Sequence, residues 1–137
     1  MPKKSRCFSL ARARKPSGWD ATLAEQFPTA ADLFQKADDV LERKLSEIAW
    51  NGPIEDLTKT SNCQPALFVH GLACLSVLRE LAGNFLIGGA AGLSLGEMTA
   101  HAAAGTFDFA NGLQLVQRRG ELMDEACADN LRRNGGD

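Results

Sequence analysis

The chain has 137 residues, 45% apolar and 23% charged, with a formal net charge of −2, which suits one soluble globular domain with a modest core. It has no uninterrupted run of about 18 apolar residues and no secretory start, so we expect no membrane span, no membrane partner and a cytoplasmic location. Four cysteines without a CxxC pair and two histidines argue against a zinc or other metal site and against a disulfide framework.

The first segment, residues 1–22, is strongly basic. Six of its residues are bases that precede the first acid, Asp20: Lys3, Lys4, Arg6, Arg12, Arg14 and Lys15. Transit peptides and nucleic-acid-binding arms also begin in this way. The segment lacks the aromatic interleaving and the reading motif of a nucleic-acid-binding protein, so we expect no nucleic-acid partner.

Two helices are predicted between residues 29 and 81. The first, over 29–47, has apolar side chains every three to four residues along one face. These are Leu33, Phe34, Ala37, Leu41 and Leu45. Asn51, Gly52 and Pro53 break this pattern. The second helix spans 65–81, with Pro65 in its first turn, where the missing N–H costs little.

A strand, a sharp turn and two more helices are predicted next. The apolar run 85–91 is too short for a helix and is bounded by turn signals, which predicts a buried strand. A helix over 95–104 follows, with Gly105 as its C-terminal cap, and then a helix over 109–127. This order predicts an α/β protein with a central, mostly parallel sheet. One strand alone makes no sheet, so we expect an incomplete domain.

The turn after the predicted strand is Gly92-Leu93-Ser94-Leu95-Gly96. A GxSxG segment on a strand-to-helix turn is typical of a nucleophile elbow, because the glycines let the backbone bend and lift the serine hydroxyl out of the sheet. Ser94 is the candidate nucleophile, and the backbone N–H of Leu95 is the candidate oxyanion donor. The pattern alone also occurs as a purely structural turn before a helix.

Several segments together resemble, in order and spacing, the malonyl-CoA:acyl-carrier-protein transacylase family. They are Thr60–Phe68, Gly92–Glu97, Ala103–Gly105 and Leu115–Met123, and the resemblance covers roughly residues 23–127. It implies an incomplete α/β-hydrolase-like acyltransferase core with a parallel sheet and a nucleophile elbow. The family's smaller ferredoxin-like subdomain is expected to be absent.

The resemblance also implies an activity, [acyl-carrier-protein] S-malonyltransferase of fatty-acid synthesis. In the family the elbow serine takes a malonyl group from coenzyme A as an ester and passes it to the phosphopantetheine thiol of acyl carrier protein. Ser94 matches this serine, and Arg119 matches the arginine that pairs with the free malonyl carboxylate through its guanidinium fork. Arg118 is expected to be a solvated surface charge. The implied partners are malonyl-CoA and acyl carrier protein, with no further cofactor, and intact relatives are expected to be monomers.

The catalytic base of the family is a histidine beyond the part that matches here. His101 lies seven positions after Ser94, about 10 Å along the helix axis and beyond hydrogen-bond reach. His70 lies among apolar residues and is expected to be a packed histidine. Because a serine without a base is a weak nucleophile, an inactive fragment stays among the alternatives.

Both ends of the chain depart from the family, and a shifted reading frame accounts for both. One permitted codon choice for residues 8–22, read in another frame, gives Phe-Pro-Gly-Gln-Gly-Ala-Gln, which is the family's opening. Residues 128–137 behave alike. We therefore divide the chain into a basic, frameshifted or disordered segment 1–22, a partial acyltransferase domain 23–127 and a frameshifted tail 128–137, which resequencing the gene would test.

Three other functions remain open. An acyltransferase module of a polyketide synthase shares the elbow and the arginine. A serine hydrolase shares the elbow, but it has no need of a partner for a buried carboxylate, so Arg119 argues against it. A non-catalytic fragment that binds acyl carrier protein is the third.

Overall fold

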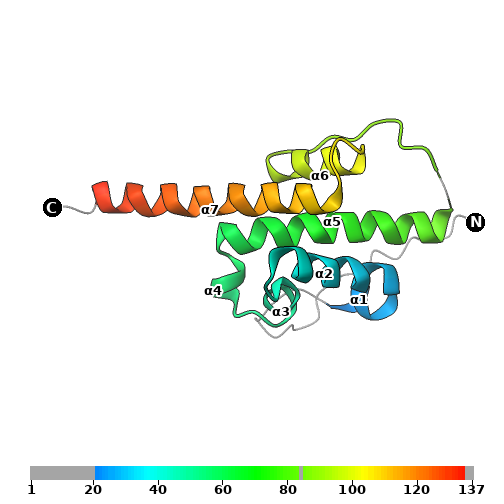
Figure 1. Cartoon of the computed structure of the whole chain (residues 1–137), viewed down its shortest axis with the longest axis horizontal. Helices are drawn as coiled ribbons and strands as arrows, with labels where there is room; N and C mark the ends of the chain where they lie inside the picture. The colour runs from blue at the N-terminus through cyan, green and yellow to red at the C-terminus, as the bar shows by residue number, and fades with distance from the viewer. Residues whose placement is uncertain (1–20, 84, 135–137) are drawn as a thin grey trace, which may run out of the picture.

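The computed structural model describes residues 21–83 and 85–134, and these residues form seven α-helices (Figure 1). They are α1 (Thr22–Gln26), α2 (Pro28–Leu41), α3 (Leu45–Asn51), α4 (Ile54–Leu57), α5 (Thr60–Ala82), α6 (Leu95–Ala103) and α7 (Phe109–Asn134). The basic start through residue 20 and the last three residues lie outside the described residues. Residues 128–134, expected as a frameshifted tail, continue α7.

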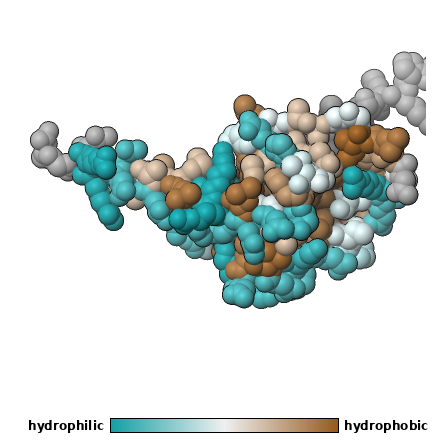
Figure 2. All heavy atoms as spheres, turned by 45° about the horizontal axis from the view of Figure 1, so that its top comes forward, coloured by the Kyte–Doolittle hydropathy of each residue, from teal (hydrophilic) through white to brown (hydrophobic). Residues whose placement is uncertain are grey.

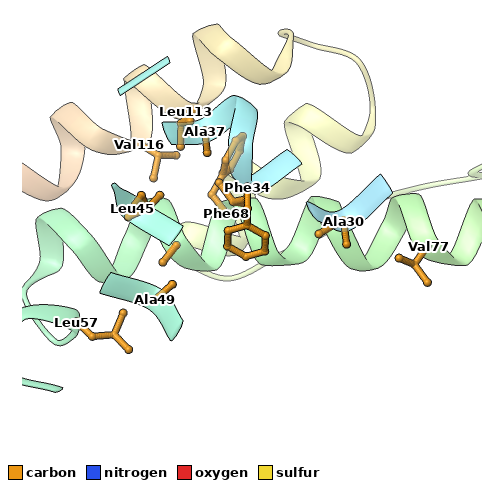
Figure 3. Packing of buried hydrophobic residues seen from close by; sticks show 13 residues of the cluster. Ala30, Phe34, Ala37, Leu45, Ala49, Leu57, Phe68, Val77, Leu113 and Val116 are labelled. Atoms are coloured by element: carbon orange, nitrogen blue, oxygen red, sulfur yellow. The ribbon is translucent and has the colours of Figure 1, made fainter. Parts of the chain in front are cut away.

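Helix α5 is the centre of the fold. It contacts α2, α3, α4, α6 and α7, and it runs antiparallel to α7 along one side (Figure 1). The core between these helices is apolar, with Phe34 and Phe68 among its largest side chains (Figure 3). The other buried residues include Ala30, Ala37, Leu45, Ala49, Leu57, Val69, Ala73, Leu113 and Val116. Burial of these side chains supplies most of the driving force for packing.

The prediction of one helix over 29–47 is wrong, because the chain turns between α2 and α3. Glu42 adopts a left-handed conformation with φ of 51°, which ends α2. The buried Asp38 accepts hydrogen bonds from the backbone N–H of Ser46, at 2.9 Å, and from its hydroxyl, at 2.6 Å. These bonds satisfy donors in the first turn of α3, so a second helix begins at Leu45.

The second predicted helix is confirmed, but it begins five residues earlier, which places Pro65 inside α5. A proline nitrogen has no hydrogen to donate to the carbonyl four residues back, here that of Ser61. The Nη2 atom of Arg43 donates to the Ser61 carbonyl oxygen instead, at 3.1 Å. A side chain from the α2–α3 turn thus replaces the helical hydrogen bond that Pro65 removes.

The first turn of α5 is fixed by α7. The N-cap residue of α5, Lys59, provides no capping side chain, and Asp124 of α7 accepts from the N–H of Thr60 at 3.0 Å and of Ser61 at 2.8 Å. A Cβ at Gly120 would lie 2.6 Å from the Thr60 carbonyl oxygen. Because the two backbones approach this closely only at glycine, α7 has one register against α5.

The predicted strand over 85–91 does not form, and the described residues contain no β-strand. A strand is held by hydrogen bonds to a neighbouring strand, and these residues have none beside them. They run instead without regular secondary structure from the end of α5 to α6 (Figure 1). The predicted helix over 95–104 is confirmed as α6, and Gly105 follows it with a φ of 79°, as expected of a C-terminal glycine.

Apolar side chains remain exposed on α5 and on the segment that follows it. The larger ones are Leu67, Leu78, Leu81, Phe85, Leu86 and Leu93. Apolar patches lie open on the face that Figure 2 brings forward. By length and composition alone, α5 also meets the criteria for a membrane-crossing helix, with a mean hydropathy of 1.3 over its most apolar window. Its contacts on several sides are those of a central helix in a globular fold.

Candidate functional site

The site begins at the turn that leads into α6. Ser94 is the N-cap residue of this helix and has φ of 55° and ψ of −112°, a conformation rarely adopted by residues other than glycine. Such a conformation costs on the order of 1–3 kcal/mol and recurs at functional sites. The turn is closed by a hydrogen bond from the N–H of Gly96 to the carbonyl oxygen of Leu93, at 2.9 Å.

The two glycines of the GxSxG segment differ in their surroundings. A Cβ at Gly92 would lie 2.1 Å from the carbonyl atoms of Gly96, so this position accepts only glycine without a shift of the backbone. A Cβ at Gly96 would meet no described atom within 4 Å. The tight turn itself therefore requires the first glycine, and the described residues give no spatial reason for the second.

Arg119 lies beside Ser94, as a site built from these two residues requires. Its Nη2 atom donates a hydrogen bond to Ser94 Oγ at 3.1 Å, which links α7 to the turn before α6. Residues 25 positions apart in the sequence thus meet through side chains. Arg118 is exposed and pairs instead with Glu121, at 3.2 Å, and with Glu125, at 3.7 Å.

A third residue of the site is Gln64, on α5. Its Oε1 atom accepts a short hydrogen bond from Nη1 of Arg119, and its Nε2 atom donates to the sulfur of Met123, at 3.1 Å. Gln64 is 6% exposed. Gln64 has no role predicted from the sequence beyond its place in the Thr60–Phe68 segment. A glutamine directly before Pro65 in an apolar helix was a signal, since buried amides need partners.

Among the described residues, no acidic side chain forms an ion pair with Arg119. Its hydrogen-bond partners in the described part of the chain, Gln64 and Ser94, are both uncharged. A partly buried guanidinium that is held by neutral groups retains its full attraction for an anion. The arrangement is therefore suited to bind a carboxylate next to a serine hydroxyl.

The predicted oxyanion donor, Leu95, and the two histidines lie in different parts of the structure. Leu95 is the first residue of α6, so its N–H is one of the donors without an acceptor inside the helix. His101 Nδ1 pairs with Thr106 Oγ1 at 3.2 Å, and its ring lies against Phe107. His70 Nε2 lies 3.6 Å from Cys74 Sγ. Within the described ranges, no group of three histidine, cysteine or acidic side chains is placed to hold a metal ion.

A largely apolar hollow of about 670 Å³ adjoins the turn. One wall is formed by α5, including Leu67 and Leu75, and the other by the 89–96 segment and α6. Small residues keep these walls close, since a Cβ at Gly71 would lie 3.0 Å from Cγ2 of Thr99. Leu67 of α5, one of the exposed apolar side chains, lines this hollow together with Leu93 and Leu95, the neighbours of Ser94.

The chain is similar to malonyl-CoA:acyl-carrier-protein transacylases in both sequence and structure. The chain is 42% identical over 111 residues to the malonyl CoA-acyl carrier protein transacylase of Bacillus subtilis, an alignment that covers 80% of this chain and 34% of the relative. The acyl-carrier-protein-S-malonyltransferase of Bartonella henselae superposes with a TM-score of 0.72 at 38% identity, over 80% of this chain and 37% of that one. No family model matches the chain.

A second similar structure is a malonyl-transacylase in complex with its acyl carrier protein, from a type II polyketide synthase. It has a TM-score of 0.72 and 42% identity, and it covers 77% of this chain and 34% of that chain. The chain spans about a third of the length of the curated relatives and solved structures that it matches. These neighbours have an α/β acyltransferase fold, so the helices described above correspond to one part of it.

Proposed function

Since the chain is homologous to the malonyl-CoA:acyl-carrier-protein transacylases over about 80% of its length, we propose that it carries the nucleophile and the carboxylate-binding site of such an enzyme. The proposed reaction moves a malonyl group from coenzyme A to the phosphopantetheine thiol of acyl carrier protein. Ser94 is the proposed nucleophile: its Oγ forms an ester bond to the malonyl carbonyl carbon, the thioester C–S bond breaks, and coenzyme A leaves as the thiol. Fatty-acid synthesis is the proposed setting.

The hydrogen bond between Arg119 and Ser94 is the observation that carries this proposal. In a malonyl group a single methylene separates the carboxylate from the reacting carbonyl, so the cation and the nucleophile must lie side by side. The 3.1 Å contact meets this requirement. An acetyl group has no carboxylate and would gain nothing from Arg119, which gives a physical basis for malonyl selectivity.

Substrate binding would also change the hydrogen bonding of Ser94. The malonyl carboxylate accepts from the Arg119 guanidinium, so Nη2 moves its hydrogen bond from Ser94 Oγ to the carboxylate. This exchange releases a lone pair of Oγ for attack on the thioester carbonyl. The N–H of Leu95, at the positive end of the α6 dipole, is the proposed donor to the developing oxyanion. The base that takes the serine proton is proposed to come from the rest of the acyltransferase fold.

We further propose that residues 85–91 become a strand when the remainder of the fold is present, which would complete a nucleophile elbow at Ser94. Three features support this. The run is apolar, it leads directly into the tight turn at Gly92, and it lies beside the uncovered apolar surface of α5. A parallel sheet buried by helices requires such a surface. The two-thirds of the relatives that this chain does not match are the proposed source of the sheet.

Complementation tests both parts of the proposal. The full chain is mixed with the unmatched part of the Bacillus subtilis relative, and complex formation is checked by size-exclusion chromatography before radiolabelled malonyl-CoA is added. We expect label on Ser94 in the complex and no label in the matched Ser94→Ala complex. A complex that forms but takes up no label would contradict the proposed chemistry.

A polyketide setting is the second candidate, because one similar structure is a malonyl-transacylase of a type II polyketide synthase. The chemistry at Ser94 and Arg119 would be the same, and the carrier protein would differ. Acyl carrier protein is the proposed partner in either setting, with its own phosphopantetheine as the acceptor group and no further cofactor. A cytoplasmic location is proposed from the bacterial relatives, although mitochondrial relatives also occur.

A further inference from the structure

Gln64 can hold Arg119 only in one of its two amide orientations. In the observed orientation Oε1 faces Nη1 of Arg119, and Nε2 faces the sulfur of Met123. A rotation of the amide by 180° would place Nε2 against the guanidinium, where two donors face each other without an acceptor. Because Gln64 is buried, water cannot readily repair such a mismatch.

Both partners of the amide lie on the same face of α7. Arg119 and Met123 are four residues apart, which brings their side chains together on a helix. The first presents a donor and the second an acceptor, so the pair matches the two ends of the Gln64 amide. A thioether is a weak acceptor, but the Met123 sulfur is the acceptor that Nε2 of Gln64 contacts in the observed orientation of the amide.

We propose that Met123 is a positioning residue that holds the Gln64 amide in place by accepting from Nε2 and, through Gln64, holds the Arg119 guanidinium beside Ser94. Its consequence for malonyl binding rests on the proposed function. Leucine at position 123 would keep the volume and the helix propensity but would offer Nε2 no acceptor. Nε2 would then be a buried donor without an acceptor, which makes the observed position of Gln64 less stable. Arg119 would have to be ordered by the ligand itself, which weakens binding.

The test measures the binding of malonate to the full chain by nuclear magnetic resonance, with acetate as the comparison ligand. Met123→Leu removes the acceptor, Met123→Gln supplies an oxygen acceptor in its place, and Met98→Leu makes the same change in the packing between α6 and the core. We expect Met123→Leu to weaken malonate binding about fivefold. Met123→Gln and Met98→Leu should stay within about twofold of the parent chain.

The side-chain amide protons of Gln64 give a readout that does not depend on binding. We expect their slow exchange with solvent in the parent chain and in Met123→Gln, and faster exchange in Met123→Leu. Unchanged exchange and unchanged affinity in Met123→Leu would overturn the inference and leave the proposed function standing. A parent chain that binds malonate no better than acetate would overturn the proposed function, while the amide protons would still decide the role of Met123.

Discussion

Ser94 combines the proposed chemistry with a strained backbone. Its φ of 55° places it in a region that favours glycine, yet a glycine there would carry no nucleophile. The hydroxyl contacts Arg119, so the strained residue is also the one that joins α6 to α7. Strain at a residue with a proposed chemical role is the pattern expected where function opposes stability.

Replacing Ser94 should separate strain from chemistry. Both Ser94→Gly and Ser94→Ala lose the hydroxyl, but only glycine relieves the positive φ. We expect the glycine variant to be more stable than the alanine variant by about 1 kcal/mol in free energy of unfolding. Urea denaturation of the two variants measures the difference, and equal midpoints would show that the turn is not strained.

The two glycines of the turn offer a matched pair of substitutions. Gly92→Ala places a Cβ against the backbone of Gly96, and we expect a loss of at least about 2 kcal/mol in unfolding free energy. Gly96→Ala meets no described atom within 4 Å and lies inside α6, so it should stabilise the chain by about 0.5–1 kcal/mol. Thermal denaturation distinguishes the two, and a tolerated alanine at position 92 would contradict the geometry of the turn.

At the scale of elements, α5 is positioned by contacts from outside its own sequence. Arg43 supplies a donor to the carbonyl that Pro65 leaves without one, and it also donates to Asn62 Oδ1 at 2.7 Å and to Gln117 Oε1 at 2.6 Å. Burial lowers the pKa of Arg43, and the nearby acidic side chains of Glu121 and Asp38 partly offset this effect. One guanidinium thus fixes the α2–α3 turn, α5 and α7 relative to each other.

A double-mutant cycle tests the pairing of Arg43 with Pro65. Arg43→Met keeps an unbranched side chain but removes the guanidinium, and it should cost about 2 kcal/mol because three acceptors lose their donor. In a Pro65→Ala background the new N–H can bond to the Ser61 carbonyl, so the same substitution should cost about 1 kcal/mol less. Chemical denaturation measures all four proteins. Strictly additive effects would show that Arg43 does not replace the missing helical bond.

Asp124 gives α5 a pH-dependent cap. Partial burial acts to raise the pKa of Asp124, but hydrogen bonds from Ser61 and Thr60 outweigh it, so the pKa lies below the ordinary value of 3.8. A lowered pKa in the folded state means that the ionised carboxylate stabilises the fold above pH 3.8 and that this contribution is lost as the pH falls through the folded pKa.

Asp124→Asn should therefore lower the unfolding free energy by about 1 kcal/mol at neutral pH and by less in acid. Urea denaturation at pH 7 and near pH 3 provides the comparison. The surface variant Glu125→Gln, one residue further on α7, should show no comparable loss. A difference between Asp124→Asn and the parent chain that grows in acid would contradict the sign of this argument.

Across the whole molecule, local sequence patterns predicted which segments are helical better than they predicted the residues at which the helices begin and end. The helices expected over 65–81, 95–104 and 109–127 and the glycine after α6 depend on local signals, and the structure confirms these elements. The break at Glu42 depends on Asp38 reaching Ser46, and the early start of α5 depends on Asp124 and Arg43. These are tertiary contacts, which no periodicity contains.

The predicted strand and the site also depend on tertiary contacts that local sequence patterns do not contain. Residues 85–91 have the composition of a buried strand, but a strand depends on its neighbours, and the described residues supply none. The sequence indicated Ser94 and Arg119 through motifs, and the structure places their two side chains in contact, while their chemical roles stay predictions. Gln64 and Met123 could not be assigned, because their roles arise from the register between α5 and α7 that Gly120 allows.

Calorimetry of the chain with malonyl-CoA and acetyl-CoA shows whether Arg119 selects a malonyl group for Ser94. We predict that the parent chain and Arg118→Ala bind malonyl-CoA at least about tenfold more tightly than acetyl-CoA, and that Arg119→Ala removes this difference. Equal affinities of the parent chain for the two thioesters, or a difference that survives in Arg119→Ala, would contradict the account.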